Sequence, residues 1–207
     1  MKRFVFDLDG TLLTGSFDFE HEYFKTIYND EATRLFNKMG EYLDEYERTF
    51  PRYSNDTLSH FLTTKSGLVF NDKVIDGWCE VMQDVPDVME DGIIEVLEYL
   101  KSKDYSLAVL TNWYGKTQIP RLERAKIIDY FDEVYTGDIV LKPHKCSYIM
   151  AMDKYDIDDC VFIGDNLEKD YIGPRASGFE SILYDKNDNY HDSIVKVKKM
   201  NELIKRY

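Results

Sequence analysis

Cysteine, proline and glycine are scarce in this sequence, and it contains no long apolar run. Among 207 residues there are 3 cysteines, 5 prolines and 11 glycines. Cys79, Cys146 and Cys160 are far apart and form no C-x-x-C pair, which disfavours a disulfide framework and a thiolate-bound zinc site. We expect these cysteines to be small core residues. No stretch reaches the roughly 18 apolar residues of a membrane-spanning helix, so no membrane partner is expected.

Positive charge is also in deficit. The chain has 26 lysines and arginines against 39 aspartates and glutamates, which gives a net charge of −13. Such a chain offers no basic stripe for a nucleic acid or an anionic membrane, so we expect a small molecule as its partner. If that ligand is an anion, a metal, a lysine or helix N-termini must supply local positive charge. The N-terminus lacks the apolar segment of a signal peptide, which predicts a cytoplasmic location, whereas the oligomeric state stays open.

A short apolar stretch followed by two aspartates stands near the N-terminus. Residues Phe4–Phe6 are too few for a helix and are typical of a strand buried on both faces of a parallel sheet. Asp7 and Asp9 are two residues apart, so their side chains point to one side if the extended backbone continues. Two carboxylates so close together repel each other unless a cation is present. The alternative is an ordinary Asp-Gly turn after an edge strand, since this dipeptide is common in loops.

Residues 14–86 carry helical patterns without a convincing strand. Apolar residues recur at helical spacing in four stretches, which are 17–28, 32–50, 54–67 and 71–82. The candidate N-caps of the last two helices are Ser54 or Asn55, and Asn71 or Asp72. The pattern predicts a small helical bundle, residues 15–85, here called the helical insert. It would interrupt a core domain formed by residues 1–14 and 86–207.

After Pro86 helical and strand patterns alternate. Strands are predicted at residues 106–110, 133–135, 161–163 and 181–184. One helix is predicted to begin near Gly92, and two others to cover residues 116–126 and 145–155. A fourth is predicted to contain Ile172 and Ala176. The C-terminal residues predict a short extended piece and a terminal helix. This alternation is typical of an α/β fold with a Rossmann-like parallel sheet flanked by helices and joined by right-handed crossovers.

Polar side chains follow the predicted strands at their carboxyl ends. They are Thr111 and Asn112, then Lys142, and finally Asp165 and Asp170. In an open parallel sheet these strand ends meet at one edge, and ligands bind in the crevice outside that edge. Since Asp7 and Asp9 follow the first strand, the sequence predicts that all of these side chains contribute to one site.

Four short motifs connect these positions with a known family. They are DLDGT at Asp7–Thr11, LTN at Leu110–Asn112, KP at Lys142–Pro143 and GDNLEKD at Gly164–Asp170. With them, essentially the whole chain resembles the haloacid dehalogenase (HAD) superfamily, in its phosphatase branch with a helical cap inserted after the first motif. The first and last motifs are specific together, whereas T-N and K-P alone are weak. One departure is His144, where relatives often have an acidic residue, and we expect it to affect only the local turn.

The resemblance implies phosphoryl transfer through a covalent intermediate. Asp7 would be the nucleophile that attacks phosphorus, and Asp9 would protonate the leaving alcohol and then activate water. A Mg²⁺ ion would be bound by Asp7, by the backbone carbonyl of Asp9 and by Asp165, because this ion prefers hard oxygen ligands. The expected substrate is a small phosphorylated metabolite, such as a sugar phosphate or a nucleotide, and the cap would select it.

The same resemblance gives the other motif residues a role around the phosphate. Thr111 and Asn112 would bind the transferring group by hydrogen bonds, aided by the N-terminus of the helix that follows them. Lys142 would neutralise Asp7 and the phosphate oxygens. Asp170 would orient Lys142 and metal-bound water.

Other activities remain open at this point. A haloacid dehalogenase uses the same nucleophile on carbon, but that branch lacks the second aspartate, so Asp9 and Asp165 favour phosphoryl transfer. A phosphomutase shares the core and differs in the cap residues that shield the phosphoenzyme from water. From another class, a phosphate-accepting receiver-like module also arranges Asp, Thr and Lys around Mg²⁺, but it lacks an acid/base like Asp9 and the helical insert. A non-catalytic relative is the last alternative.

Overall fold

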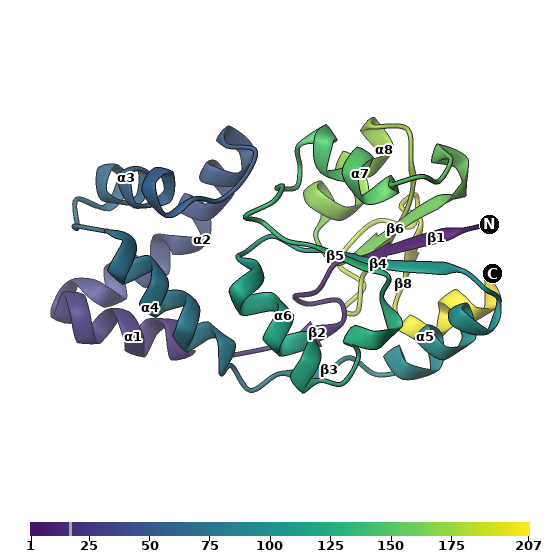
Figure 1. Ribbon diagram of the computed structural model, residues 1–207, viewed down its shortest axis with the longest axis horizontal. Helices are drawn as coiled ribbons and strands as arrows, with labels where there is room; N and C mark the ends of the chain where they lie inside the picture. The colour runs from purple at the N-terminus through teal and green to yellow at the C-terminus, as the bar shows by residue number, and fades with distance from the viewer. Residues whose placement is uncertain (17) are drawn as a thin grey trace.

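The predicted α/β fold is confirmed. The structure is a computed structural model that describes residues 1–16 and 18–207, so Phe17, in the first predicted helix, lies outside the described residues. Figure 1 shows a sheet with helices on both faces and, beside it, the helices of the helical insert. Both chain termini lie on the side of the sheet remote from these helices (Figure 1).

Six parallel strands form the main sheet, in the order β5-β4-β1-β6-β7-β8. Their bounds are β1 Arg3–Phe6, β4 Ser106–Leu110, β5 Glu133–Tyr135, β6 Cys160–Gly164, β7 Glu180–Tyr184 and β8 Lys196–Val197. The strand predictions agree with these bounds to within one residue. β1 is central, because Phe6 lies beside Val109 of β4 on one side and Ile163 of β6 on the other.

Alternate residues of β1 point to opposite faces of the sheet and bury two cores. Phe4 and Phe6 pack with residues of α5 (Ile93–Ser102), α6 (Gly115–Arg124) and η5 (Met200–Lys205). Val5 packs on the other face with residues of α7 (Lys145–Met152). Figure 1 shows α5 and α7 on the two sides of the sheet. Because both faces of β1 are covered, the strand is apolar from Phe4 to Phe6.

Short helical elements complete the sheet unit and correct one expectation. They are η2 Ile128–Tyr130, η3 Ile157–Asp159, the π-helix η4 Leu167–Ile172 and α8 Gly173–Ala176. The single helix expected around Ile172 and Ala176 is therefore two elements.

The expectation that every cysteine is a core residue is wrong for Cys146, which is exposed, whereas Cys79 and Cys160 are buried. Cys146 lies on the solvent side of α7, while the next residues of that helix are buried.

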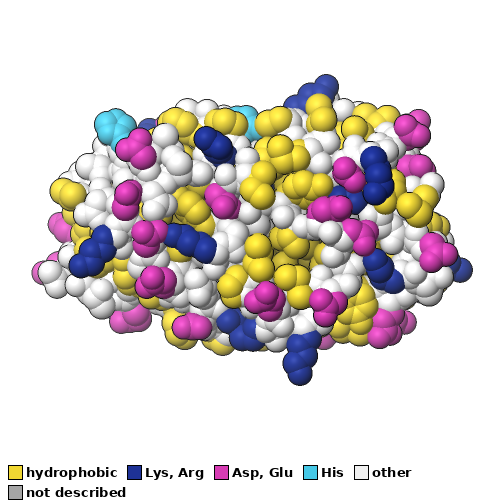
Figure 2. Space-filling view, in the orientation of Figure 1, with side chains coloured by type: hydrophobic (Ala, Val, Ile, Leu, Met, Phe, Trp, Pro, Cys, Tyr) yellow, Lys and Arg dark blue, Asp and Glu magenta, His cyan; other side chains and the backbone are white. Residues whose placement is uncertain are grey.

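The helical insert has a hydrophobic core of its own. Its elements are α1 Asp18–Tyr28, η1 Asn29–Glu31, α2 Ala32–Thr49, α3 Asn55–Ser66 and α4 Asp72–Gln83. Phe24, Tyr46 and Trp78 are buried between these helices, and the same cluster extends onto Tyr114 and Leu141 of the sheet unit. On the face shown in Figure 2, lysines and arginines are scattered between acidic side chains rather than gathered in a stripe. The division into two domains near residues 14 and 86 stays a prediction.

The structure selects one N-cap for each helix at which the sequence left two. Ser54 Oγ accepts a hydrogen bond from the Thr57 N–H at 3.3 Å, and Asn71 Oδ1 accepts one from the Val74 N–H at 3.1 Å. Gly67 ends α3 with a left-handed φ of 75°.

A small antiparallel ribbon is a feature that the sequence did not predict. β2 (Leu13–Thr14) pairs with β3 (Val88–Met89). The ribbon joins the point where the chain leaves for α1 to the point where it returns from α4. Two-residue strands are too short for any periodicity to reveal.

Among the described residues, no helix combines the length and the apolar character needed to cross a bilayer.

We expect Ser54→Ala to lower the free energy of unfolding by about 1 kcal/mol, because it removes the side-chain acceptor at the start of α3. Urea unfolding followed by circular dichroism measures the loss. Thr64→Ala is the matched control, since Thr64 is exposed on the same helix and its hydroxyl donates to the His60 carbonyl. That variant is expected to stay within about 0.5 kcal/mol of the wild type. Equal losses in the two variants would contradict the capping role of Ser54.

Candidate active site

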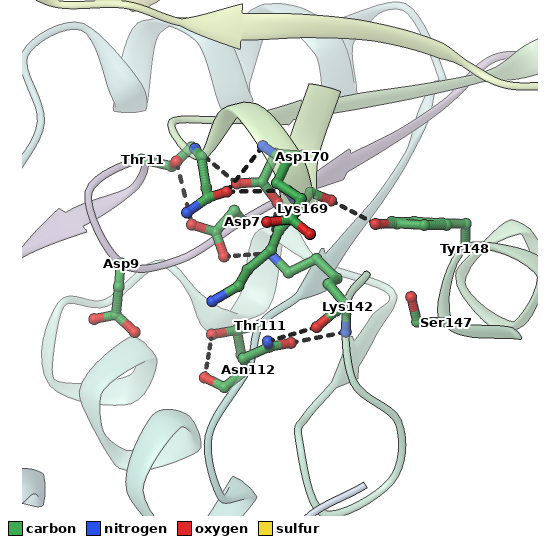
Figure 3. A network of polar contacts seen from close by, with 12 residues as sticks. Asp7, Asp9, Thr11, Thr111, Asn112, Lys142, Ser147, Tyr148, Lys169 and Asp170 are labelled. Carbon is green, nitrogen blue, oxygen red and sulfur yellow. Dashed lines mark hydrogen bonds and ion pairs between the residues drawn. The ribbon is translucent and has the colours of Figure 1, made fainter. Parts of the chain in front are cut away.

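A cavity of about 330 Å³ lies at the carboxyl edge of the main sheet. All the site residues expected from the sequence line it, namely Asp7, Asp9, Thr111, Asn112, Lys142, Asp165 and Asp170. They follow β1, β4, β5 and β6, whose carboxyl ends meet there. Figure 3 shows how most of these side chains converge. The structure therefore brings together residues that are up to 163 positions apart, from Asp7 to Asp170.

Lys142 is the centre of a buried ion-pair network. Its ammonium lies 2.7 Å from Asp7 Oδ1 and 2.7 Å from Asp170 Oδ1 (Figure 3). The lysine side chain is only 4% exposed. Burial acts to lower the pKa of Lys142, but the carboxylates of Asp170 and Asp7 outweigh it and raise this pKa above its ordinary value. The lysine is therefore charged at neutral pH.

Three carboxylates gather around this ammonium. Asp7, Asp165 and Asp170 each place one oxygen within 4.8 Å of the others. Burial raises the pKa of Asp7 well above its usual range, with Lys142 opposing the shift and the other two carboxylates adding to it. Desolvation and the charge of Asp170 raise the pKa of Asp165 to about 6, although part of its surface remains open to solvent. When all three are ionised, one ammonium leaves two negative charges uncompensated.

The chemistry of this cluster fits a hard divalent cation. Carboxylate oxygens are the ligands that Mg²⁺ prefers, and its two charges would balance the excess. Both oxygens of Asp170 already have donors, because Lys142 binds Oδ1 and the Asn166 N–H binds Oδ2 at 3.0 Å. Asp7 Oδ2 accepts only a long hydrogen bond, from Thr11 Oγ1 at 3.3 Å, so Asp7 and Asp165 are the side chains of the cluster best placed to hold a cation. Histidine and cysteine do not line the part of the cavity that the structure describes.

Asn112 fixes the segment that carries Lys142. Its Nδ2 donates to the Lys142 carbonyl and its Oδ1 accepts from the Lys142 N–H, both at 2.9 Å. The hydroxyl of Thr111 also has protein partners, because it donates to the Asn112 carbonyl at 3.1 Å and accepts from Gln118 Nε2 at 2.9 Å. The first N–H of α6, at Gly115, donates to Asp138 Oδ1 at 2.8 Å. That carboxylate offsets the positive potential expected from the helix N-terminus.

Two glycines make room for the cluster. Gly10 has a left-handed φ of 79°, and a Cβ atom there would lie 2.4 Å from Asp165 Oδ2. A Cβ atom at Gly164 would lie 2.3 Å from Asp170 Cγ. A side chain at Gly10 would displace Asp165, and one at Gly164 would displace Asp170 from Lys142.

The Asp9 side chain is set apart from the Lys142 network (Figure 3). Its Oδ2 accepts a hydrogen bond from Gln118 Nε2 at 2.7 Å, and its Oδ1 lies 2.7 Å from Arg121 Nη2. Both partners come from the buried face of α6. The metal contact expected from the sequence concerns the backbone carbonyl of Asp9. The side-chain carboxylate of Asp9 is therefore not required as a metal ligand.

Ion pairs connect the helical insert with η4 beside the cavity. Lys169 lines the cavity, and its ammonium lies 2.7 Å from Asp44 and 2.5 Å from Glu47 of α2. Arg48 of α2 makes two hydrogen bonds to Glu168, at 2.9 and 2.6 Å. These contacts hold α2 next to the Asp165 side of the site.

Sequence reasoning missed Gln118, Arg121 and Lys169. The first two are three positions apart on α6 and almost fully buried, so they share one face of the helix. Polar residues on a buried helix face need polar partners. The spacing of Gln118 and Arg121 on one helix face was therefore the signal in the sequence that could have identified them. Lys169 lies inside the GDNLEKD motif, where it is flanked by acidic residues and reads as solvated surface.

Two named phosphatases resemble this chain over most of its length. The ribulose-1,5-bisphosphate 5-phosphatase of Halopiger xanaduensis is 28% identical over 178 residues, which cover 83% of this chain and 72% of that protein. The glyceraldehyde 3-phosphate phosphatase of Pyrococcus abyssi is 23% identical over 203 residues, which cover 89% and 81% of the two chains.

Solved structures share the fold. The putative HAD-hydrolase YfnB from Bacillus subtilis, bound to magnesium, superposes with a TM-score of 0.72 at 16% identity, covering 99% of this chain and 97% of that chain. The L-2-haloacid dehalogenase from Xanthobacter autotrophicus gives a TM-score of 0.72 at 17% identity with the same coverage. At such identities these likenesses show the fold alone.

The sequence also matches a protein-family model, and the match runs from the first strand to the end of β7. That family is described as haloacid dehalogenase-like hydrolase, and it matches residues 4–184. This range contains every site residue discussed above. The chain therefore belongs to the haloacid dehalogenase-like hydrolase family.

Proposed function

We propose that this protein is a Mg²⁺-dependent phosphatase that hydrolyses a small phosphomonoester through an aspartyl-phosphate on Asp7. The observation that carries the proposal is the buried Lys142 ammonium between Asp7 and Asp170, with Asp165 beside them. A phosphate dianion can approach a carboxylate nucleophile only if negative charge in the site is masked. Lys142 supplies part of this masking, and a cation held by Asp7, Asp165 and the Asp9 carbonyl would supply the rest.

In the first step, one carboxylate oxygen of Asp7 attacks the phosphorus atom. The bond between phosphorus and the leaving oxygen breaks, and that oxygen takes a proton from the Asp9 carboxyl group. Lys142 and Thr111 line the cavity where the phosphoryl oxygens would be. The Lys142 ammonium stabilises the charge of the transferring group, and the Thr111 hydroxyl would do so by turning its hydrogen away from the Asn112 carbonyl.

In the second step, water attacks the phosphorus of the aspartyl-phosphate. Asp9, now ionised, takes a proton from this water, and the bond between phosphorus and the Asp7 oxygen breaks. Inorganic phosphate leaves, the Asp7 carboxylate is restored and Asp9 again carries its proton. Every proton transfer thus uses the same side chain.

Phosphoryl transfer explains residues that cleavage of a carbon–halogen bond does not need. A halide leaves without a proton, and its departure needs no divalent cation. An acid/base at Asp9 and a carboxylate cluster that fits Mg²⁺ therefore favour a phosphate ester as substrate. The names of the two similar phosphatases support the same choice, since both refer to small phosphorylated sugars. The cavity volume of about 330 Å³ suits a metabolite of this size.

We expect Asp7→Asn to lower the hydrolysis of 4-nitrophenyl phosphate by at least about 10³-fold, because an amide replaces the nucleophile. The assay follows 4-nitrophenolate release with Mg²⁺ and with a chelator, which is expected to abolish activity. Asp158→Asn is the matched control, since this exposed residue lies in η3 at the amino end of β6, away from the site. Activity retained in Asp7→Asn would contradict its role, and an inactive wild-type protein with Mg²⁺ would contradict the proposed function.

We expect Mg²⁺ to raise the melting temperature of the wild-type protein, because a ligand that binds only the folded state stabilises it. In Asp165→Asn this rise should be at most about half as large at the same Mg²⁺ concentration, since one ligand is weakened. With a chelator at neutral pH, the same variant should melt above the wild type, because desolvation and the charge of Asp170 raise the pKa of Asp165 and so disfavour its ionised form, whereas asparagine carries no charge. Differential scanning fluorimetry measures both effects. Identical shifts in the wild type, Asp165→Asn and Asp158→Asn would exclude Asp165 as a ligand.

A further inference from the structure

Arg121 binds both the Asp9 carboxylate and the segment that joins the helical insert to the sheet. Asp87 lies in this connecting segment, between α4 and β3. Arg121 Nε and Nη2 bind the two oxygens of Asp87 at 3.0 and 2.6 Å. The same Nη2 atom lies 2.7 Å from Asp9 Oδ1. One guanidinium therefore holds the two carboxylates together.

Burial makes this arrangement rigid. The side chain of Arg121 is 3% exposed and that of Asp87 is 5% exposed. A buried guanidinium requires a full set of acceptors, and the third is Gln118 Oε1, which accepts from Arg121 Nη1 at 2.7 Å. Arg121 is thus fixed by three side chains, and any shift of Asp87 with the connecting segment moves it.

Gln118 completes the contact with Asp9 and leaves it free to carry a proton. Its Nε2 lies 2.7 Å from Asp9 Oδ2, 2.9 Å from Thr111 Oγ1 and 3.2 Å from the Asn112 carbonyl. An amide group has two hydrogens for these three acceptors. When Asp9 Oδ2 is protonated, both hydrogens can go to Thr111 and Asn112. Arg121 then keeps Oδ1 in place while Oδ2 carries the proton.

We propose that Arg121 is a positioning residue for the general acid Asp9, and that Asp87 sets the position of Arg121. The role rests on the proposed phosphatase function. Arg121 holds Oδ1 by an ion pair and Gln118 holds Oδ2 by a hydrogen bond, so the carboxyl group keeps one orientation at the wall of the cavity, where the leaving oxygen of the substrate would be. Without the guanidinium, the Asp9 carboxyl group rotates among its side-chain conformers and the leaving oxygen loses an aligned proton donor.

Two substrates that differ in their need for a proton test this role. 4-Nitrophenyl phosphate has a leaving group that departs as a stable anion, whereas 4-nitrobenzyl phosphate releases an alcohol that must be protonated. We expect Arg121→Met to lower kcat/KM for the benzyl ester by about 10- to 100-fold and that for the phenyl ester by less than about 3-fold. A purely structural defect would lower both values by the same factor, so the ratio of the two is the readout.

Arg124→Met is the matched control. Arg124 lies on the same helix and binds the last residue of α4, through the Gln83 carbonyl, and the same connecting segment, through the Val85 carbonyl and Asp87 Oδ2. This variant is expected to keep the wild-type ratio, because Asp87 keeps both of its hydrogen bonds from Arg121 when Arg124 is replaced.

Gln118→Leu is the second test variant, since it removes the hydrogen bond to Asp9 Oδ2 and leaves the two hydrogen bonds from Arg121 to Asp87 in place. It is expected to change the ratio in the same direction by a smaller factor, and it decides the question if Arg121→Met does not fold. An unchanged ratio in the folded variants, or a gain of activity on the benzyl ester, would overturn the role of Arg121 while the phosphatase function stands. Failure of the wild-type protein to hydrolyse either ester would overturn the proposed function, and this role with it.

Discussion

The paired charges of Lys142, Asp7 and Asp170 are the constraint on which the site depends. An ammonium that is nearly excluded from water is tolerated only with carboxylates in direct contact, and both of its partners are 2.7 Å away. Each partner in turn would be costly to bury without the lysine. The network therefore forms as a unit, and it forms only when the segments after β1, β5 and β6 are brought together by the folded sheet.

Sheet topology explains why a lysine stands at this position. β5 is the edge strand, and β4 separates it from β1, so residues after β5 begin about 10 Å from those after β1. A long side chain is needed to cross part of that distance. The backbone must also turn inward, and Asn112, which follows the intervening strand β4, binds both the N–H and the carbonyl of Lys142. Asn112 thus acts on the site through the position of Lys142.

The sequence predicted the features that depend on local pattern. Strands buried on both faces appear as short apolar runs. Parallel topology alone then places the polar residues that follow these strands at the carboxyl edge of the sheet. Partners of individual side chains could not be predicted in this way. Arg3 reads as the start of a strand, but it is fully buried and binds the Ala151 carbonyl, Ser106 and Glu133, which lie more than 100 positions away. Helical periodicity likewise places Gln118 on a buried face without naming Asp9 as its partner.

The charges around the cavity also explain how an anionic chain could take an anionic substrate. In the described part of the cavity both lysines are paired, Lys142 with Asp7 and Asp170 and Lys169 with Asp44 and Glu47. Withdrawing Lys169 toward a phosphate would leave Glu47, whose side chain is 6% exposed, as an unpaired buried charge, and that cost opposes the move. Three carboxylates and one ammonium give the cluster a charge of −2, which a divalent cation brings to zero. Under the proposed function, the cation therefore decides whether a phosphate dianion meets a repulsive site or a neutral one in which Lys142 can attract it.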